Sequence, residues 1–224
     1  MENAPVEFSK ERFLIFIVKQ VLICSFLFFG ILLCNAQKDT REIFDASDIH
    51  KIEIYADEVY KISLYTSGTE EIKISTHSEG EYYNNIFLVT EVEKQTLKLS
   101  SRFPKALTGG YDKLSAHKII SMEIKLEVPE NIQVFISSNL ASVEAGGSFK
   151  YLFADLKDGY CRLLSFKGKA TVNTYKGNIY VETTPVNVQA KSRNGIVYVQ
   201  PGIRGTNLLK LKSINGDIRV LRTK

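Results

Sequence analysis

The stretch YKGNIYVETTPVNVQAKSRNGIVYV, residues 175–199, contains the same short pattern twice. Gly177 is followed by apolar residues two and four places later, at Ile179 and Val181. The pattern returns 18 residues further on, where Gly195 precedes Val197 and Val199. Because successive side chains of a β-strand point to opposite faces, each copy predicts a short strand with one apolar face, entered through a glycine turn.

The pattern extends along the chain when it is read in steps of nine residues. The steps begin at residue 132 and continue through residue 195, and after a three-residue insertion they resume at residue 207. The residues two and four positions after each of these starting residues are apolar. These positions are Val134, Ile136, Val143, Ala145, Leu152, Ala154, Cys161, Leu163, Ala170, Val172, Ile179, Val181, Val188, Ala190, Val197, Val199, Leu209, Leu211, Ile218 and Val220. Glycine is concentrated at every second step, where turns favour it. We therefore predict an all-β fold, a β-solenoid of about nine-residue strand-turn units with two strands per coil of about 18 residues. A β-sandwich built from hairpins is the alternative.

Upstream of residue 131 the alternation continues with uneven spacing. Paired apolar positions such as Ile52/Ile54 and Ile62/Leu64 predict strands. The segment Arg102 to Lys118 contains Pro and Gly-Gly and predicts a long loop. We expect residues 37–130 to form an irregular β region of the same body, and residues 131–224 to form the regular repeats.

The first 36 residues have the order of a secretory signal peptide. A charged flank precedes the apolar run Val21 to Leu33, and a small residue, Ala36, follows. We predict cleavage between Ala36 and Gln37, which leaves an exported mature chain without a membrane span. Two alternatives are an uncleaved anchor and a lipoprotein with its lipid on Cys34.

The composition excludes several classes of partner and cofactor. The net charge of +4 is spread along the chain, so no nucleic-acid partner is expected. Lysine or arginine lies beside most turn glycines, where a calcium site needs carboxylates. The histidines His50, His77 and His117 lack metal-ligand spacing, and Cys161 falls on an inward position as a core thiol. We predict no metal, no cofactor and no catalytic residues.

One set of outward positions forms the candidate site. On the glycine-rich side of each predicted coil, one residue lies between the two apolar positions and points outward. In four successive coils this residue is Arg162, Tyr180, Tyr198 and Arg219, and Tyr160 lies nearby. If the coils stack in register, these five residues form an exposed column. Aromatic rings beside cationic donors can bind sugar rings, anionic glycans or a protein partner. The alternative is a cross-strand ladder that only covers the sheet.

The phrases YKGNIYVET, SRNGIVYV and SINGDIRVL resemble a group of exported bacterial "putative adhesins" and domains of unknown function built from short β-repeats, with a Bacteroidetes-type signal end in LLCNAQ. The resemblance implies a right-handed solenoid-like fold and a place in the periplasm or on the outer surface of a Gram-negative bacterium. We expect a non-enzymatic adhesin-like or scaffolding protein that binds a cell-surface glycan or an envelope protein, with weak self-association through the C-terminal coil. A polysaccharide-acting β-helix enzyme and an envelope-stress sensor are the alternatives.

Overall fold

The computed structural model describes residues 13–22, 37–57, 59–80, 86–102 and 121–223. The chain divides into two compact units, Met1–Ala36 and Gln37–Lys224. In the first unit, residues 13–22 are helical, and no helix among the described residues has the length and apolarity needed to cross a membrane. Most of the predicted loop between Arg102 and Lys118, and Ala36 at the predicted cleavage site, lie outside the described residues.

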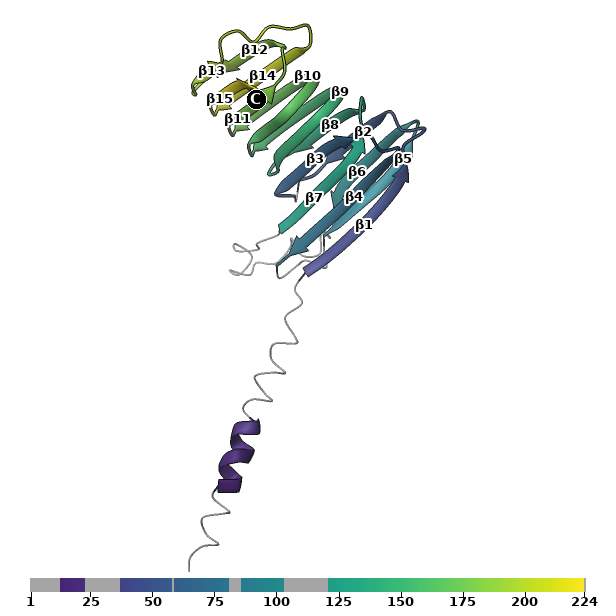
Figure 1. Ribbon diagram of the computed structural model, residues 1–224, viewed down its shortest axis with the longest axis vertical. Helices are drawn as coiled ribbons and strands as arrows, with labels where there is room; N and C mark the ends of the chain where they lie inside the picture. The colour runs from purple at the N-terminus through teal and green to yellow at the C-terminus, as the bar shows by residue number, and fades with distance from the viewer. Residues whose placement is uncertain (1–12, 23–36, 58, 81–85, 103–120, 224) are drawn as a thin grey trace, which may run out of the picture. The chain divides into compact units, whose positions relative to one another are not determined.

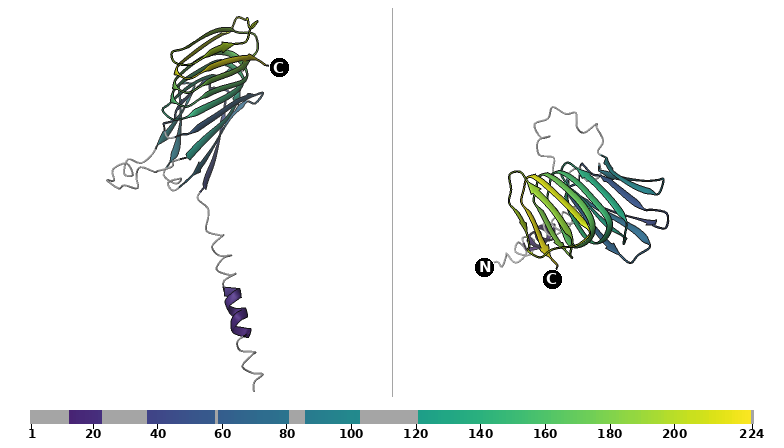
Figure 2. Two further views of the ribbon diagram at one scale, coloured as in Figure 1. Left: turned by 90° about the vertical axis from the view of Figure 1, so that its left-hand side faces the viewer. Right: turned by 90° about the horizontal axis from the view of Figure 1, so that it is seen from above.

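The second unit is all-β, as predicted, and its fifteen described strands form one sheet that curls along its length (Figures 1 and 2). The strands are β1 (Gln37–Asp45), β2 (Lys51–Tyr55), β3 (Lys61–Ser67), β4 (Glu71–Glu79), β5 (Phe87–Glu93), β6 (Thr96–Arg102), β7 (Ser121–Pro129), β8 (Gln133–Ser138), β9 (Ser142–Asp158), β10 (Cys161–Lys176), β11 (Ile179–Thr183), β12 (Asn187–Ser192), β13 (Val197–Val199), β14 (Leu208–Asn215) and β15 (Ile218–Arg222). They pair in two rows. The first row runs β1-β4-β7-β3-β9-β10-β11-β15-β13, and the second runs β5-β6-β2-β8-β9-β10-β14-β12.

The long strands β9 and β10 belong to both rows. The start of β10 pairs with β11, and its end pairs with β14. Because these strands continue from one row into the other, the inward side chains of both rows share a single hydrophobic core. Phe149 and Phe166 stack at 5.5 Å inside this core, where the two strands turn.

The parallel pairing of β9, β10 and β11 has the register that the repeat predicts. Val143 lies opposite Cys161, and Cys161 lies opposite Ile179, so equivalent residues stand 18 positions apart. Sixteen of the twenty predicted core positions are buried, and the four that are not are Val188, Ala190, Val197 and Val199. These four belong to β12 and β13, which therefore form the least covered part of the repeat.

The glycine corners are required by the close approach of successive turns. A Cβ on Gly177 would lie 1.9 Å from the carbonyl oxygen of Gly159, and Gly177 has a φ of 150°. The polar side chains beside the glycines join the turns: the Asp217 N–H donates to Asn178 Oδ1 at 2.8 Å, and the Ile196 N–H donates to Asp217 Oδ1 at 2.8 Å. The Gly-Asn and Gly-Asp pairs thus hold one turn against the next.

The order of the last strands corrects one expectation. The repeat predicted that β13 follows β11 and that the C-terminal strands form the open end. Instead, β15 lies between β11 and β13, and β14 lies between β10 and β12 (Figure 1). Each row therefore has a place one strand wide between earlier strands, and β14 and β15 occupy these two places. The open edge of this end is therefore β12 and β13, where Ile196 is 73% exposed.

Residues 37–130 contain both parallel and antiparallel pairs. β2 and β3 pair in parallel with β8 and β9 and so extend the two rows. Beyond them, β4 pairs antiparallel with β1 and β7, and β5 pairs antiparallel with β6. Antiparallel pairs need no fixed coil length, which accounts for the uneven spacing of apolar pairs in this region.

Candidate binding surface

The predicted column lies on the outward face of the first row. In β10, Cys161 and Leu163 are buried, so Arg162 between them points outward. By the same alternation, the half-buried Tyr180 in β11 and the exposed Arg219 in β15 point outward. Because the pairing is parallel and in register, Arg162 lies opposite Tyr180, Tyr180 opposite Arg219, and Arg219 opposite Tyr198. We call Tyr160, Arg162, Tyr180, Arg219 and Tyr198 the tyrosine–arginine column.

Glu144 of β9 anchors one end of the column. Its carboxylate lies 3.3 Å from Nη1 of Arg162 and 3.0 Å from Nζ of Lys61, and accepts a 3.0 Å hydrogen bond from the Tyr160 hydroxyl. The hydrogen bond from Lys61 is the main cause that lowers the pKa of Glu144. The Arg162 guanidinium also lies 5.4 Å from the Tyr160 ring. This end is therefore neutralised and held in place from within.

The other end carries charge that is not neutralised. The Arg219 guanidinium lies 5.8 Å from the ring of Tyr198, and it has no ion-pair partner among the described residues. The Tyr180 hydroxyl donates a 2.6 Å hydrogen bond to Glu182, which raises the pKa of that tyrosine and fixes its ring. Tyr198 is 47% exposed. An exposed cation therefore stands between two aromatic rings.

A hollow of about 380 Å³ lies over the column. Its lining residues come from the column and the adjoining turns, and are Tyr160, Cys161, Arg162, Asn178, Ile179, Tyr180, Asp217 and Arg219. Four of the five predicted residues thus line one hollow. Tyr198 lies outside the lining, and its ring is adjacent to the Arg219 guanidinium. Two guanidiniums against one carboxylate give the hollow a net positive lining.

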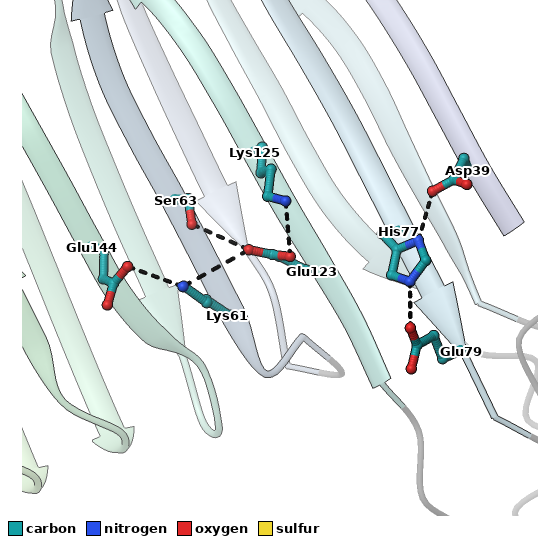
Figure 3. Close-up of polar contacts among 8 residues, drawn as sticks. All are labelled: Asp39, Lys61, Ser63, His77, Glu79, Glu123, Lys125 and Glu144. Atoms are coloured by element: carbon teal, nitrogen blue, oxygen red, sulfur yellow. Dashed lines mark hydrogen bonds and ion pairs between the residues drawn. The ribbon is translucent and has the colours of Figure 1, made fainter. Parts of the chain in front are cut away.

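The outward face that carries the column continues onto β3, β7, β4 and β1. Charged side chains on this part of the face form ion pairs with one another (Figure 3). Glu123 lies 3.3 Å from Nζ of Lys125 and 4.0 Å from Nζ of Lys61. A hollow of about 490 Å³ lies here, and its lining contains two contacting pairs, Glu123 with Lys125 and Asp39 with His77, together with Arg41. Most of its charged groups therefore already contact one another.

His77 in β4 is a site that the sequence did not predict. Its Nδ1 lies 2.6 Å from Asp39 and its Nε2 lies 2.6 Å from Glu79 (Figure 3). The hydrogen bond with Glu79, followed by that with Asp39, raises the pKa of His77. The antiparallel pairing of β1 with β4 places Asp39 opposite His77, and this register could not be read from the spacing.

The residues considered as metal ligands or as a reactive thiol can be placed in the structure. No group of three or more metal-ligating side chains occurs in the part of the chain that the structure describes. Cys161 is fully buried, as predicted, and burial raises the pKa of its thiol to about 12, so it is not a thiolate at neutral pH. His50 is exposed in a turn, and His117 lies outside the described residues.

The two-row, all-β sheet is also found in a solved structure of another protein. The chain is similar to the crystal structure of a protein from Clostridium sporogenes described as a putative cell adhesion protein, with a TM-score of 0.62 and 16% identity over 84% of this chain and all of that one. A putative adhesin from Bacteroides fragilis matches at a TM-score of 0.39 and 15% identity, over 82% of this chain and 97% of that one. No protein-family model matches the sequence, and no curated protein matches it. The first likeness shows a shared fold.

Proposed function

We propose that this chain is a non-enzymatic, exported β-solenoid that acts as an adhesin-like or scaffolding protein of the bacterial cell envelope. Its tyrosine–arginine column binds a glycan or a protein surface. The observation that carries the proposal is the position of Arg219, an exposed cation without an ion-pair partner among the described residues, between Tyr180 and Tyr198.

The solenoid assignment is supported by the register of the parallel strands. Equivalent residues in β9, β10 and β11 stand 18 positions apart, and β9 and β10 each contribute to both rows, as one coil of a solenoid would. Coil-to-coil hydrogen bonds satisfy the backbone, so the outward side chains are free to contact a partner.

The column suits a saccharide for two reasons. The faces of tyrosine rings pack against the C–H groups of a sugar ring, and guanidinium groups donate paired hydrogen bonds to carboxylate or sulfate groups. Tyr180 is fixed by its bond to Glu182, and Arg162 by Glu144, so little side-chain entropy is lost on binding.

The proposed location and role draw on the signal-like N-terminus and on the fold shared with a protein described as a putative cell adhesion protein. We place the protein in the periplasm or on the outer surface of a Gram-negative cell. Adhesion needs a rigid surface that displays side chains at fixed spacing, and stacked parallel strands about 4.8 Å apart provide it.

Binding of the protein, produced from the full chain, to a glycan array and to envelope fractions tests the proposal. We expect the double variant Tyr180→Ala/Tyr198→Ala to lose the binding that the wild type shows. The control is Tyr55→Ala/Tyr60→Ala, which removes two tyrosines that are 54% and 45% exposed outside the column. Unchanged binding in a folded column variant would overturn the role of the column. Release of saccharide fragments during the assay would instead favour the polysaccharide-acting enzyme.

A further inference from the structure

A groove of about 500 Å³ runs across the ends of β8, β9, β10, β14 and β12, on the other side of the Gly177 turn from the column. Two exposed rows form its walls. One row is Ser137, Asp155, Asn173, Lys212 and Lys191, each directly opposite the next. The other row, two residues further along each strand, is Asn139, Lys157, Tyr175, Ile214 and Arg193.

Between the two walls lies a row of buried side chains that fixes the floor of the groove. Thr174 and Ser213 are 3% and 5% exposed, and their hydroxyls lie 2.9 Å apart. The Thr174 hydroxyl also donates to the carbonyl of Gly177 at 2.8 Å, and the Ser192 hydroxyl donates to the carbonyl of Gly216 at 2.7 Å. These bonds tie each strand end to its turn, so the groove is formed before any ligand arrives.

The groove carries positive charge that the protein does not neutralise. Four cations line it, Lys157, Lys191, Arg193 and Lys212, against one carboxylate, Asp155. None of the four cations has an ion-pair partner among the described residues. Lys212 and Lys191 lie directly opposite each other on neighbouring parallel strands, where like charges destabilise a sheet. An anionic ligand would relieve this repulsion.

The remaining lining residues indicate which anion fits. Tyr175 and Ile214 are 49% and 37% exposed, and they offer an apolar surface beside the cations. The amides of Asn139 and Asn173 can pair with hydroxyl groups. The carboxylate of Asp155 can accept hydrogen bonds from sugar hydroxyl groups. One aromatic ring does not make the series of stacking platforms that single-stranded nucleic acids need.

We infer that this groove is a second binding site, specific for an acidic polysaccharide that carries carboxylate or sulfate groups. The five strands span four strand spacings, or about 19 Å, which is the length of a short oligosaccharide. The polymer lies across the strands, with its acidic groups toward Lys191, Lys212 and Arg193 and its hydroxyls toward Asp155 and Asn173. This site is independent of the tyrosine–arginine column and goes beyond the function proposed for it.

The test is the binding of a hexamer of galacturonic acid to the protein, produced from the full chain, by calorimetry at two salt concentrations. We expect salt-dependent binding that weakens about tenfold or more in Lys191→Gln/Lys212→Gln. The matched control is Lys169→Gln/Lys210→Gln, which removes the same charge from exposed residues of β10 and β14 outside the groove and is expected to weaken binding less than about twofold.

Three results would overturn the inference. They are no binding of the hexamer, an equal loss in the groove and control variants, and binding of a single-stranded DNA of equal charge that is as tight and as sensitive to the groove variant. The column variant Tyr180→Ala/Tyr198→Ala separates this site from the proposed function. Loss of hexamer binding in the column variant, with binding kept in the groove variant, would support the column and refute the groove.

Discussion

Tyr180 lies directly opposite Arg219 in the parallel pairing of β11 with β15. The arginine therefore lies between Tyr180 and Tyr198, and the two tyrosines are not direct neighbours. The next strand outward places Tyr198 opposite the same arginine, with the guanidinium 5.8 Å from its ring. Arg219 is therefore the residue through which the two aromatic side chains are connected.

A double-mutant cycle measures this connection. We expect Arg219→Ala and Tyr198→Ala to show a coupling free energy of about 0.5 kcal/mol, the value typical of an exposed cation–π pair. The measurement is urea unfolding of the wild type, both single variants and the double variant. Arg219 and Tyr160 have no recorded contact, and their cycle should be additive. Equal coupling in the two cycles would show that the Tyr198 contact has no energetic significance.

The glycine corner at 177 should tolerate no larger side chain. In Gly177→Ala, the added Cβ would meet the Gly159 carbonyl oxygen at 1.9 Å, so the two turns must separate. We expect a loss of about 3 kcal/mol or more in the free energy of unfolding, measured by urea titration. Gly68→Ala is the matched control, since a Cβ there meets nothing within 4 Å and should change stability by less than about 1 kcal/mol. Equal losses would contradict the close-approach argument.

His77 should make stability depend on pH. Because its folded pKa is raised above the ordinary value of 6.5, its protonated contacts with Glu79 and Asp39 stabilise the fold fully below pH 6.5. That contribution disappears as the pH rises through the folded pKa. We expect the urea midpoint of the wild type to fall across this interval, and the fall to be smaller in His77→Gln. The same slope in both proteins would assign the pH dependence to other groups, and His50→Gln serves as the control.

Cys161 should be inert in the folded protein. Burial raises the pKa of its thiol to about 12, and the side chain is inaccessible. In a chain with Cys24 and Cys34 replaced by serine, we expect a thiol reagent to label the native protein at the rate of global unfolding and the denatured protein at once. Rapid labelling of the native state would show that the stack opens locally around β10.

Two copies of the chain should pair through the open edge strand β13. We propose that a second copy of the chain pairs there, because β13 has no neighbour on its outer side among the described strands and Ile196 and Val197 are 73% and 40% exposed. Sedimentation should show concentration-dependent dimers that Ile196→Lys abolishes. Ile43→Lys, on the edge strand β1, is the control. A dimer that survives Ile196→Lys but not Ile43→Lys would place the contact at the other edge.

The sequence predicts which residues form the core, but it does not predict the order of the last strands in the sheet. The apolar positions after each nine-residue step predicted the inward face correctly through Val181. Ile179 and Val181 can pair in parallel with Val197 and Val199 or with Ile218 and Val220, since both pairs are β-branched and have the same alternation. Apolar spacing therefore cannot distinguish the two neighbours. In the structure, Gly205 of the three-residue insertion lies against the Pro185 backbone, a tertiary contact that the spacing does not record.

Four of the column residues, Arg162, Tyr180, Tyr198 and Arg219, were predicted to share one face because their spacing follows the same step, and Tyr160 was added as a nearby residue. The groove was not predicted, because its residues follow each pair of apolar positions, at places that the nine-residue step assigns to turns. The signal was present at Lys157, Tyr175, Arg193 and Ile214, which occupy equivalent places in four strands. The pairing of His77 with Asp39 depends on a 38-residue separation and an antiparallel register, which no local pattern records.

The position of β14 and β15 between earlier strands determines when folding can finish. The segment from Asn187 to Val199 has no complete neighbour until Leu208–Arg222 enters the gap beside it. A chain that is synthesised from its N-terminus, or that passes through a membrane pore, therefore cannot add these strands to the sheet in the order of the sequence. The two rows of the sheet stay incomplete until residues 208–222 are available, and β14 and β15 then pair on both sides. A chain truncated before residue 208 would lose more than β14 and β15, because the four strand pairings that these strands make with β10, β12, β11 and β13 would never form.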